Sequence, residues 1–188
     1  MASTDLVLTC LRDLASPLRI DRHAPLDPAT LAPEPRIRKL CEDNLCGNFG
    51  RHPQCPPQLG TLDQATARLR AFRQGLLFQT AYEVDARDVA ATRLTQQDHQ
   101  RAALALEAAA RDRVDPRAEV LVGGPCVRCD PACPALDGAP CEHPALARPS
   151  LEALGVDVVA LQQAVGWDAA FRDDRVTWTG ALLWDPGR

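Results

Sequence analysis

Residues 118–129 of this 188-residue chain are AEVLVGGPCVRC, an apolar run that ends at two glycines and leads directly into two cysteines. The run over 118–122 predicts a short buried strand. Upstream, alternating side chains over 77–84 predict another strand, and the Ala- and Leu-rich stretch over 95–113 predicts a helix between them. Strand, helix and strand in this order predict a βαβ unit. The cysteines then follow the carboxyl end of a strand, where open α/β sheets bind ligands.

The remaining pattern predicts a small mixed fold. Thr61 and Gln64 fit a capping box for a helix over about 62–74, with Gly75 placed to end it. Towards the end of the chain, the pattern predicts a helical turn near 150–154, a helix over 157–165 that ends before Gly166, and a strand over 176–184. The expected fold class is α/β: a small single-domain sheet containing a βαβ unit, with two cysteine-rich metal-binding loops.

Five prolines between residues 16 and 35 separate an amino-terminal segment from this pattern. Proline removes a backbone donor and restricts the residue before it, so we expect irregular, extended chain there. The predicted organisation is a proline-rich leader over 1–35, packed on the surface, and a metal-binding α/β domain over 36–188.

Composition excludes several classes of partner. The formal net charge is −4, whereas nucleic-acid-binding proteins concentrate positive charge. No apolar run approaches the length that spans a bilayer, and the amino terminus lacks the features of an export signal. We therefore expect no nucleic acid and no membrane as partners, and a cytoplasmic location.

The eight cysteines are the main chemical feature of the chain. Disulfides are rare in cytosolic proteins and do not require tight local clustering, whereas metal ligation does. Seven of the eight fall into two groups, and we predict that these seven bind metal: Cys41, Cys46 and Cys55 in the first group, and Cys126, Cys129, Cys133 and Cys141 in the second.

The second group can complete an all-thiolate site by itself. Its Cys-x2-Cys step places two thiolates at one site, and Pro134 follows a ligand as in ferredoxin-type sequences. This pattern favours a [4Fe-4S] cluster. Zinc uses the same four thiolates, although ribbon-type zinc sites usually show two close pairs and this group has one. The remaining interpretation is a loop of reduced cysteines without metal.

The first group offers three thiolates and one imidazole, His52. The fourth position is then filled by His52, filled by a residue from elsewhere such as Cys10, or left open for chemistry. The simpler interpretations are a solvated loop histidine and, for Cys10, a buried free thiol. The spacing is not the Cys-x3-Cys-x2-Cys of radical enzymes.

The order of motifs resembles a known family. The segments CGNFG at 46–50 and CPP at 55–57, followed by GPCVRC at 124–129, CEHP at 141–144 and RPSLEA at 148–153, are similar to prokaryotic proteins described as predicted metal-binding proteins. Phe49 stands where a tyrosine is usual in that family. The resemblance covers about residues 36–184 and implies a metal site on the seven cysteines, without implying a particular activity.

The segment after the last cysteine also belongs to this resemblance and has two interpretations. In one, Ser150 caps a helical turn and the segment only positions the cysteine loop. In the other, Arg148 faces an anionic cluster while Glu152 and Asp157 accept hydrogen bonds around it. His143, two residues after a predicted ligand, either substitutes as a ligand or donates to a cluster sulfur.

These patterns support three functions. The favoured one is an iron–sulfur protein with one or two [4Fe-4S] clusters that acts as a redox or electron-transfer accessory to a partner protein. The alternative is a zinc-binding structural or interaction module, or a metal carrier. A third is an enzyme that acts at an open iron of the three-cysteine site.

Overall fold

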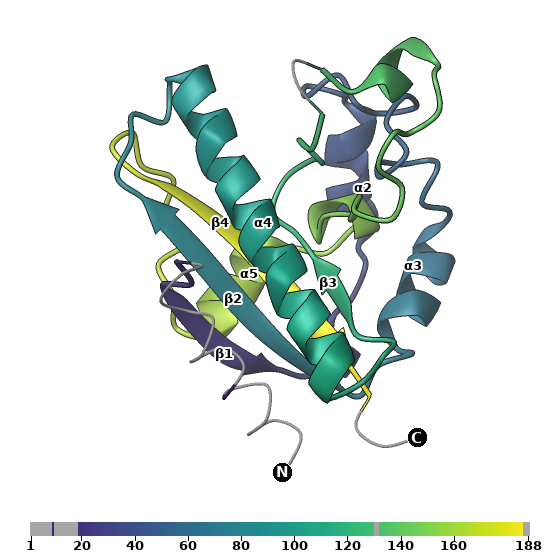
Figure 1. The fold of residues 1–188 in the computed structure, drawn as a ribbon, viewed down its shortest axis with the longest axis vertical. Helices are drawn as coiled ribbons and strands as arrows, with labels where there is room; N and C mark the ends of the chain where they lie inside the picture. Colours follow the sequence, from purple (N-terminus) through teal and green to yellow (C-terminus); the bar gives the residue numbers. More distant parts are fainter. Residues whose placement is uncertain (1–8, 10–18, 130–131, 186–188) are drawn as a thin grey trace.

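Four strands form one sheet at the centre of the fold (Figure 1). The structure, a computed structural model, describes Thr9 and residues 19–129 and 132–185. The strand order is β1-β2-β4-β3, and every strand is antiparallel to its neighbour. The strands are β1 (Arg22–Leu26), β2 (Gln74–Tyr82), β3 (Glu119–Leu121) and β4 (Val176–Trp184).

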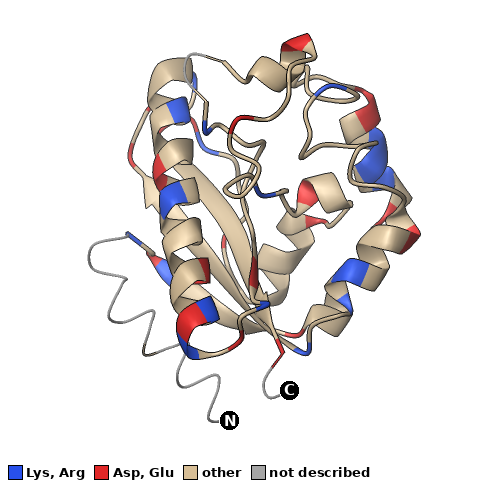
Figure 2. Cartoon of the chain, turned by 45° about the vertical axis from the view of Figure 1, so that its right-hand side comes forward, with Lys and Arg blue, Asp and Glu red and all other residues tan. Residues whose placement is uncertain are grey.

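Helices cover both faces of this sheet. The long helix α4 lies across one face, and α5 and α3 lie on the opposite side (Figure 1). Charges of both signs mark α4 along its length (Figure 2). The α-helices of the described residues are α2 (Pro35–Glu42), α3 (Leu62–Leu69), α4 (Val89–Arg113) and α5 (Val158–Ala164), and the 3-10 turns are η1 (Pro28–Thr30), η2 (Pro134–Asp137) and η3 (Glu152–Leu154).

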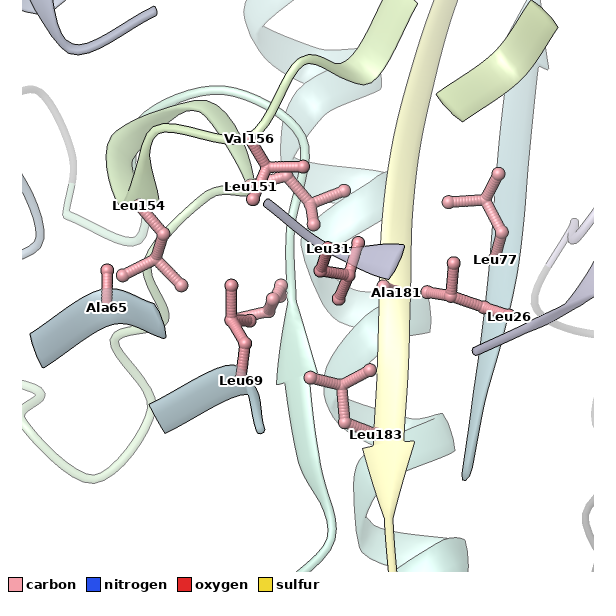
Figure 3. Packing of buried hydrophobic residues seen from close by; sticks show 11 residues of the cluster. Leu26, Leu31, Ala65, Leu69, Leu77, Leu151, Leu154, Val156, Ala181 and Leu183 are labelled. Atoms are coloured by element: carbon pink, nitrogen blue, oxygen red, sulfur yellow. The ribbon is translucent and has the colours of Figure 1, made fainter. Parts of the chain in front are cut away.

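The two-residue period of the strands divides the core between these layers. Leu76 and Phe78 of β2 pack in the cluster beneath α4, together with Leu106 of that helix. Leu77 belongs to the cluster on the other face, with Leu69 of α3 (Figure 3). The centre of the sheet is therefore buried on both sides, which confirms the α/β fold class.

The expected βαβ unit is present in split form. β2 and β3 run in the same direction, because each is antiparallel to β4, and α4 connects them. They are not paired with one another, since β4 lies between them. A βαβ unit in its simple form pairs its two parallel strands directly, and here they are separated because β4, a strand from the end of the chain, lies between them.

Local signals confirm several elements and correct two boundaries. The capping box of α3 is present, as are α5 with its Asp157 cap and the strand over 176–184. α3 ends at Leu69, so Gly75 is not its cap but lies within β2, where a Cβ would come within 3.1 Å of the Leu26 carbonyl oxygen. α4 begins at Val89, six residues before the expected start, because Asp88 caps it by accepting from the Ala91 N–H.

The proline-rich segment contributes regular structure that the sequence analysis did not predict. Residues 22–26 form β1, which pairs with β2 at the edge of the sheet. Pro25 is tolerated there because one side of an edge strand needs no ladder hydrogen bonds. Leu26 and Leu31 then pack in the core cluster of the α3 face. The part of the segment before residue 19, apart from Thr9, lies outside the described residues.

Substituting Leu31→Ala tests how strongly this segment is tied to the core. The side chain is 1 % exposed, so its truncation should lower the free energy of unfolding by about 2–5 kcal/mol. Leu45→Ala is the matched control, because Leu45 is 96 % exposed and the same truncation there should cost little. Chemical denaturation of both variants measures the difference, and equal stability would contradict the packing described above.

Candidate metal centre

The amino-terminal half of α4 holds the second cysteine loop through amide side chains. Gln96 and Gln100 each donate to the Pro125 carbonyl, at 2.7 and 2.8 Å, and the Gln100 side-chain oxygen accepts from the Val127 N–H at 3.1 Å. Gly124 has a φ of +67°, and a Cβ there would lie 2.5 Å from the Gln96 side-chain nitrogen. Glycine is therefore required at this turn. The backbone just before and after Cys126 is fixed to one helix.

His99 on the same face of α4 secures the start of this loop. It is fully buried, and its Nε2 accepts from the Gly123 N–H at 3.0 Å while its Nδ1 lies 3.0 Å from the Thr80 hydroxyl. Because Nε2 must be an acceptor, the proton is on Nδ1 and the ring is neutral. Burial lowers the pKa of His99 to about 3, which agrees with a neutral imidazole.

Gln96, His99 and Gln100 were not predicted as functional residues, although a signal for them is present in the sequence. Residues 96, 99, 100, 103, 106, 107 and 110 form one stripe of α4, and all of them are buried. The carboxyl-terminal part of the stripe is mostly apolar and packs on the sheet, while the amino-terminal part is made of Gln96, His99 and Gln100. Amide and imidazole side chains on a buried stripe need buried partners, and here the partners are loop backbone groups.

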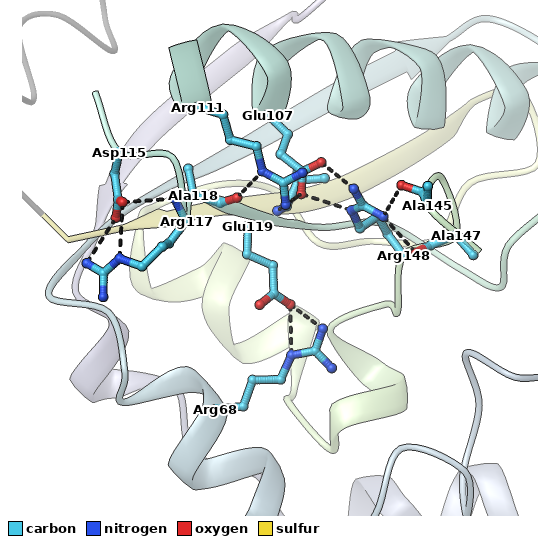
Figure 4. A network of polar contacts seen from close by, with 11 residues as sticks. Arg68, Glu107, Arg111, Asp115, Arg117, Ala118, Glu119, Ala145, Ala147 and Arg148 are labelled. Atoms are coloured by element: carbon cyan, nitrogen blue, oxygen red, sulfur yellow. Dashed lines mark hydrogen bonds and ion pairs between the residues drawn. The ribbon is translucent and has the colours of Figure 1, made fainter. Parts of the chain in front are cut away.

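Arg148 anchors the far end of the same loop to α4 (Figure 4). Its guanidinium donates to both carboxylate oxygens of Glu107, at 2.9 and 2.6 Å, and both groups are largely buried. Its remaining terminal nitrogen donates to the carbonyls of Ala145 and Ala147. Glu107 also accepts from the Val120 N–H of β3 at 3.0 Å. The structure thus gives Arg148 a positioning role in this loop, and a direct role towards a cluster stays a prediction.

The other residues of the carboxyl-terminal motif have local partners as well. Ser150 accepts from the Ala153 N–H at 3.1 Å, as the capping interpretation predicts. Asp157 caps α5 and accepts from Arg36 at 2.5 Å. The Glu152 carbonyl lies 3.9 Å from the Cys41 thiol, which brings the motif beside the first cysteine group. Burial raises the pKa of the Glu152 carboxyl.

The two cysteine loops lie side by side at one end of the sheet (Figure 1). Arg51 of the first loop donates twice to the Leu136 carbonyl of the second, at 2.9 and 2.6 Å. In the first loop, Gly47 and Gly50 both have a φ of +74°, as expected for residues that let the chain turn tightly around a site. The side-by-side arrangement brings both groups of thiols to one place.

The thiols of both groups influence one another. Burial raises the pKa of Cys55 to about 12, and the neighbouring sulfurs of Cys46, Cys41 and Cys126 add to the effect. Burial also raises the pKa of Cys126, with contributions from Cys133 and Cys141. Thiols in such surroundings stay protonated unless a cation compensates the charge, and metal ions are the cations that thiolates bind.

Cys129 has two further potential ligands beside it. Burial is the largest cause of the raised pKa of Cys129, and the neighbouring sulfur of Cys133 is the second. One ligand atom each from Cys129, Glu142 and His143 lies within 4.8 Å of the other two. The expected proximity of His143 to the thiols is therefore present, and Glu142 is an addition that the sequence analysis did not name. Whether His143 ligates or donates stays a prediction.

A cavity of about 210 Å³ lies between the two loops. Cys126, Cys129 and Cys133 line it from the second loop, and His52 lines it from the first. His52 is 3 % exposed, so the solvated interpretation is wrong. Its Nδ1 accepts from the Gln54 N–H at 3.0 Å, which leaves the ring proton on Nε2. An Nε2–H is a hydrogen-bond donor and not a metal ligand.

Buried polar atoms without partners cluster around this cavity and the neighbouring thiols. Seven buried side-chain atoms of the described residues have no hydrogen-bond partner. His52 Nε2 and Arg128 Nε belong to residues that line the cavity, and Arg38 Nε and Nη2 belong to a residue whose charge acts on Cys41. The other three are Tyr82 Oη, Arg175 Nε and the acceptor Glu152 Oε2. Arg38 acts on Cys41, whose pKa its charge lowers against the larger effect of burial. Unsatisfied buried donors are rare in folded proteins and call for an acceptor. An anionic metal–sulfur centre held by the cysteines would supply one, so these residues fit such a group.

Cys10, the eighth cysteine, lies outside the described residues. All seven of the others are free thiols. Their assignment as ligands rests on spacing, mutual proximity and the donors around them. In the described part of the chain, no helix combines the length and apolarity needed to cross a membrane.

An α/β domain that gathers cysteine thiols from two loops at one end of its sheet is the class of protein that the fold and the site define. The chain belongs to the family described as "Predicted metal-binding protein (DUF2284)", whose family model matches residues 24–184. This description gives metal binding as the predicted property of the family and names no kind of metal. Neither a curated protein nor a solved structure matches the chain.

Substituting His99→Gln should change how stability depends on pH. The folded pKa near 3 lies below the unfolded value of about 6.5, so below pH 6.5 only the unfolded chain takes up this proton. The native protein should therefore lose about 1.4 kcal/mol of unfolding free energy per pH unit through this group as the pH falls from 6.5 towards 3, with no such loss above 6.5. Denaturation at pH 7, 6 and 5 measures the slope of the unfolding free energy against pH. Below pH 6.5 this slope should be smaller in the variant by about 1.4 kcal/mol per pH unit, the contribution of one proton.

Proposed function

We propose that the protein is an iron–sulfur protein that serves as a redox or electron-transfer accessory. In this proposal Cys126, Cys129, Cys133 and Cys141 hold a [4Fe-4S] cluster, and Cys41, Cys46 and Cys55 form a second, three-thiolate site beside it. When bound, an iron–sulfur cluster accepts and donates single electrons at a potential set by charge, hydrogen bonds and burial. The chain itself supplies the thiolates, the donors around them and the protection from water.

The buried donors without partners are the observation that carries this proposal. His52 Nε2 and Arg128 Nε belong to residues that line the cavity with three of the thiols. A tetrahedral zinc ion sits about 2.3 Å from each thiolate and needs no adjoining space. A cavity of about 210 Å³ whose lining includes the residues that carry these N–H groups suits a larger anionic group whose own sulfides accept hydrogen bonds.

A zinc-binding structural module or metal carrier is the second candidate. The grouping of Cys129 with Glu142 and His143 favours it, because thiolate, carboxylate and imidazole are all common zinc ligands. Such a site would use Cys129 alone among the thiols of the second loop, so Cys126, Cys133 and Cys141 would not be ligands of that zinc ion. A zinc site on this grouping therefore differs from the cluster in both metal content and ligand set, whereas zinc on the four thiolates of the second loop differs in metal content alone.

Metal analysis of protein purified without oxygen decides between them. The proposal expects a brown protein with broad visible absorbance, acid-labile sulfide and roughly four iron atoms per chain or more. Cys133→Ser should lose most of the iron and sulfide and melt at a lower temperature, because metal binding contributes to folding stability. Cys10→Ser is the matched control and should keep its metal. A colourless protein with stoichiometric zinc and no sulfide would end the iron–sulfur proposal.

His52→Ala tests the role of the imidazole. Because Nδ1 is occupied by the Gln54 N–H, we expect His52 to donate from Nε2 to a sulfur, so the variant should keep its iron content. Loss of an N–H donor to a cluster should lower its reduction potential, since such hydrogen bonds stabilise the more negative reduced state. A spectroscopic redox titration measures the shift. Loss of one iron equivalent per chain would instead identify His52 as a ligand.

This role for His52 also bears on the three-thiolate site. With His52 acting as a donor, three protein sulfurs remain from the first group, and a fourth position is open to another residue or to an external ligand. In the electron-transfer proposal, a partner protein would exchange electrons at this end of the sheet. An enzymatic reaction at the open position is the further extension of the same site.

A further inference from the structure

A second and larger cavity lies next to the cysteine cavity, on the outer side of α4. Its volume is about 510 Å³, within the range of small-molecule sites. We call it the arginine groove, defined by the residues that line it: Ala90, Arg93, Leu94, Gln97, Arg101, Val127 and Arg128. It differs from the metal centre in that no cysteine lines it.

The groove is built by one stripe of α4 and the segment that follows Cys126. Residues 90, 93, 94, 97 and 101 lie at helical spacing on one side of α4, next to the stripe that packs on the sheet. Gln97 and Arg93 reach the loop, donating to the carbonyls of Val127 and Cys129 at 3.4 and 2.5 Å. The walls are thus tied together and the groove is formed in advance of any ligand.

Its charge departs from that of the whole chain. Three guanidinium groups line the groove and no carboxylate does, in a chain of net charge −4. Arg101 is paired with Asp98, one turn away on the helix. Arg128 has a buried Nε without a partner among the described residues. Figure 2 shows blue segments both on this part of α4 and on the neighbouring loop. A local excess of guanidinium groups favours an anion.

The groove and the cysteine cavity are neighbours. Arg93, Val127 and Arg128 line both of them. A ligand held by Arg93 and Arg128 therefore lies at the boundary of the metal centre. The other walls, Leu94, Ala90 and Val127, are apolar, and Leu94 is 63 % exposed at a helix position where a surface leucine has no packing role.

We propose that the arginine groove binds a small organic anion, with its carboxylate or phosphate on Arg93, Arg101 and Arg128 and its apolar part against Leu94 and Val127. Guanidinium forks match both kinds of oxyanion in geometry, so the shared chemistry is an oxyanion with an apolar portion. Such a site places a metabolite-sized ligand beside the metal centre. The proposal stands whichever metal the cysteines hold.

Calorimetric titration of the protein, purified without oxygen, with hexyl phosphate, hexanoate and 1-hexanol tests this site. At least one of the anions should bind about tenfold more tightly than the alcohol, and the tighter anion identifies the head group. Arg101→Gln and Arg128→Gln should each weaken that anion about tenfold. Arg172→Gln is the matched control: it removes the same charge from an exposed arginine that is also paired with an aspartate, Asp174, outside the groove.

A third variant separates the groove from general charge attraction. Leu94→Gln should weaken hexyl phosphate but leave the binding of inorganic phosphate unchanged. Because Arg128 follows Cys126 by two residues and its loss can disturb the cysteine loop, the Arg101 variant, on the helix, is the stricter test. Unchanged affinity in Arg101→Gln, equal binding of hexanol, or no binding of either anion at millimolar concentration would each overturn the proposal.

Discussion

The backbone of residues 123–129 turns away from β3 at Gly124 and is wholly or partly buried, so its polar groups need hydrogen-bond partners, and the side chains of α4 supply them. An unpaired buried amide or carbonyl costs about 1–3 kcal/mol, so a loop of this kind forms only against a surface that offers matching partners. Gln96, His99 and Gln100 are those partners. Their own positions are set by the apolar half of the same helix stripe, which packs on the sheet. The course of the second cysteine loop around Cys126 therefore derives from the packing of one helix.

The Glu107–Arg148 pair extends this control to the other end of the loop. Glu107 lies on the same stripe and also accepts from the backbone of β3, so strand, helix and loop meet at one carboxylate. A buried ion pair contributes more to specifying an arrangement than to net stability, because desolvation offsets much of its attraction. Here it selects where residues 145–148 lie, next to the segment that carries Glu142 and His143. The second cysteine loop is thus positioned by the polar residues of this stripe: Gln96, His99, Gln100 and Glu107.

Local patterns predicted much of this architecture. The capping box at Thr61, the Asp157 cap, the alternation along β2 and β4, and the two glycines after β3 act over a few residues, so they are visible in the sequence. The start of α4 was missed because Thr95, with Asp98 three residues later, imitates a capping pair, while the true cap, Asp88, lies seven residues before Thr95. β1 was missed because its proline argues against a strand except at an edge, and edge position is a property of the whole sheet. The candidate ligands were found by spacing alone. Gln96 and Gln100 were not found, since their partner Pro125 lies 29 and 25 residues away in the chain. Glu142 was not found because an acidic residue in a loop carries no signal of its own, and only the fold brings it beside Cys129.

The sequence by itself determined that the chain carries two cysteine-rich loops on a small α/β domain, because ligand spacing and strand and helix periods are local properties. Only the tertiary structure decided which strand lies between β2 and β3, since backbone ladders carry little sequence information and β4 comes from more than 50 residues further along the chain. It also decided that the ring proton of His52 is on Nε2, because the Gln54 amide occupies the other ring nitrogen. The joining of the two loops beside a groove of arginines is likewise a result of folding, as it depends on contacts between residues that are remote in sequence.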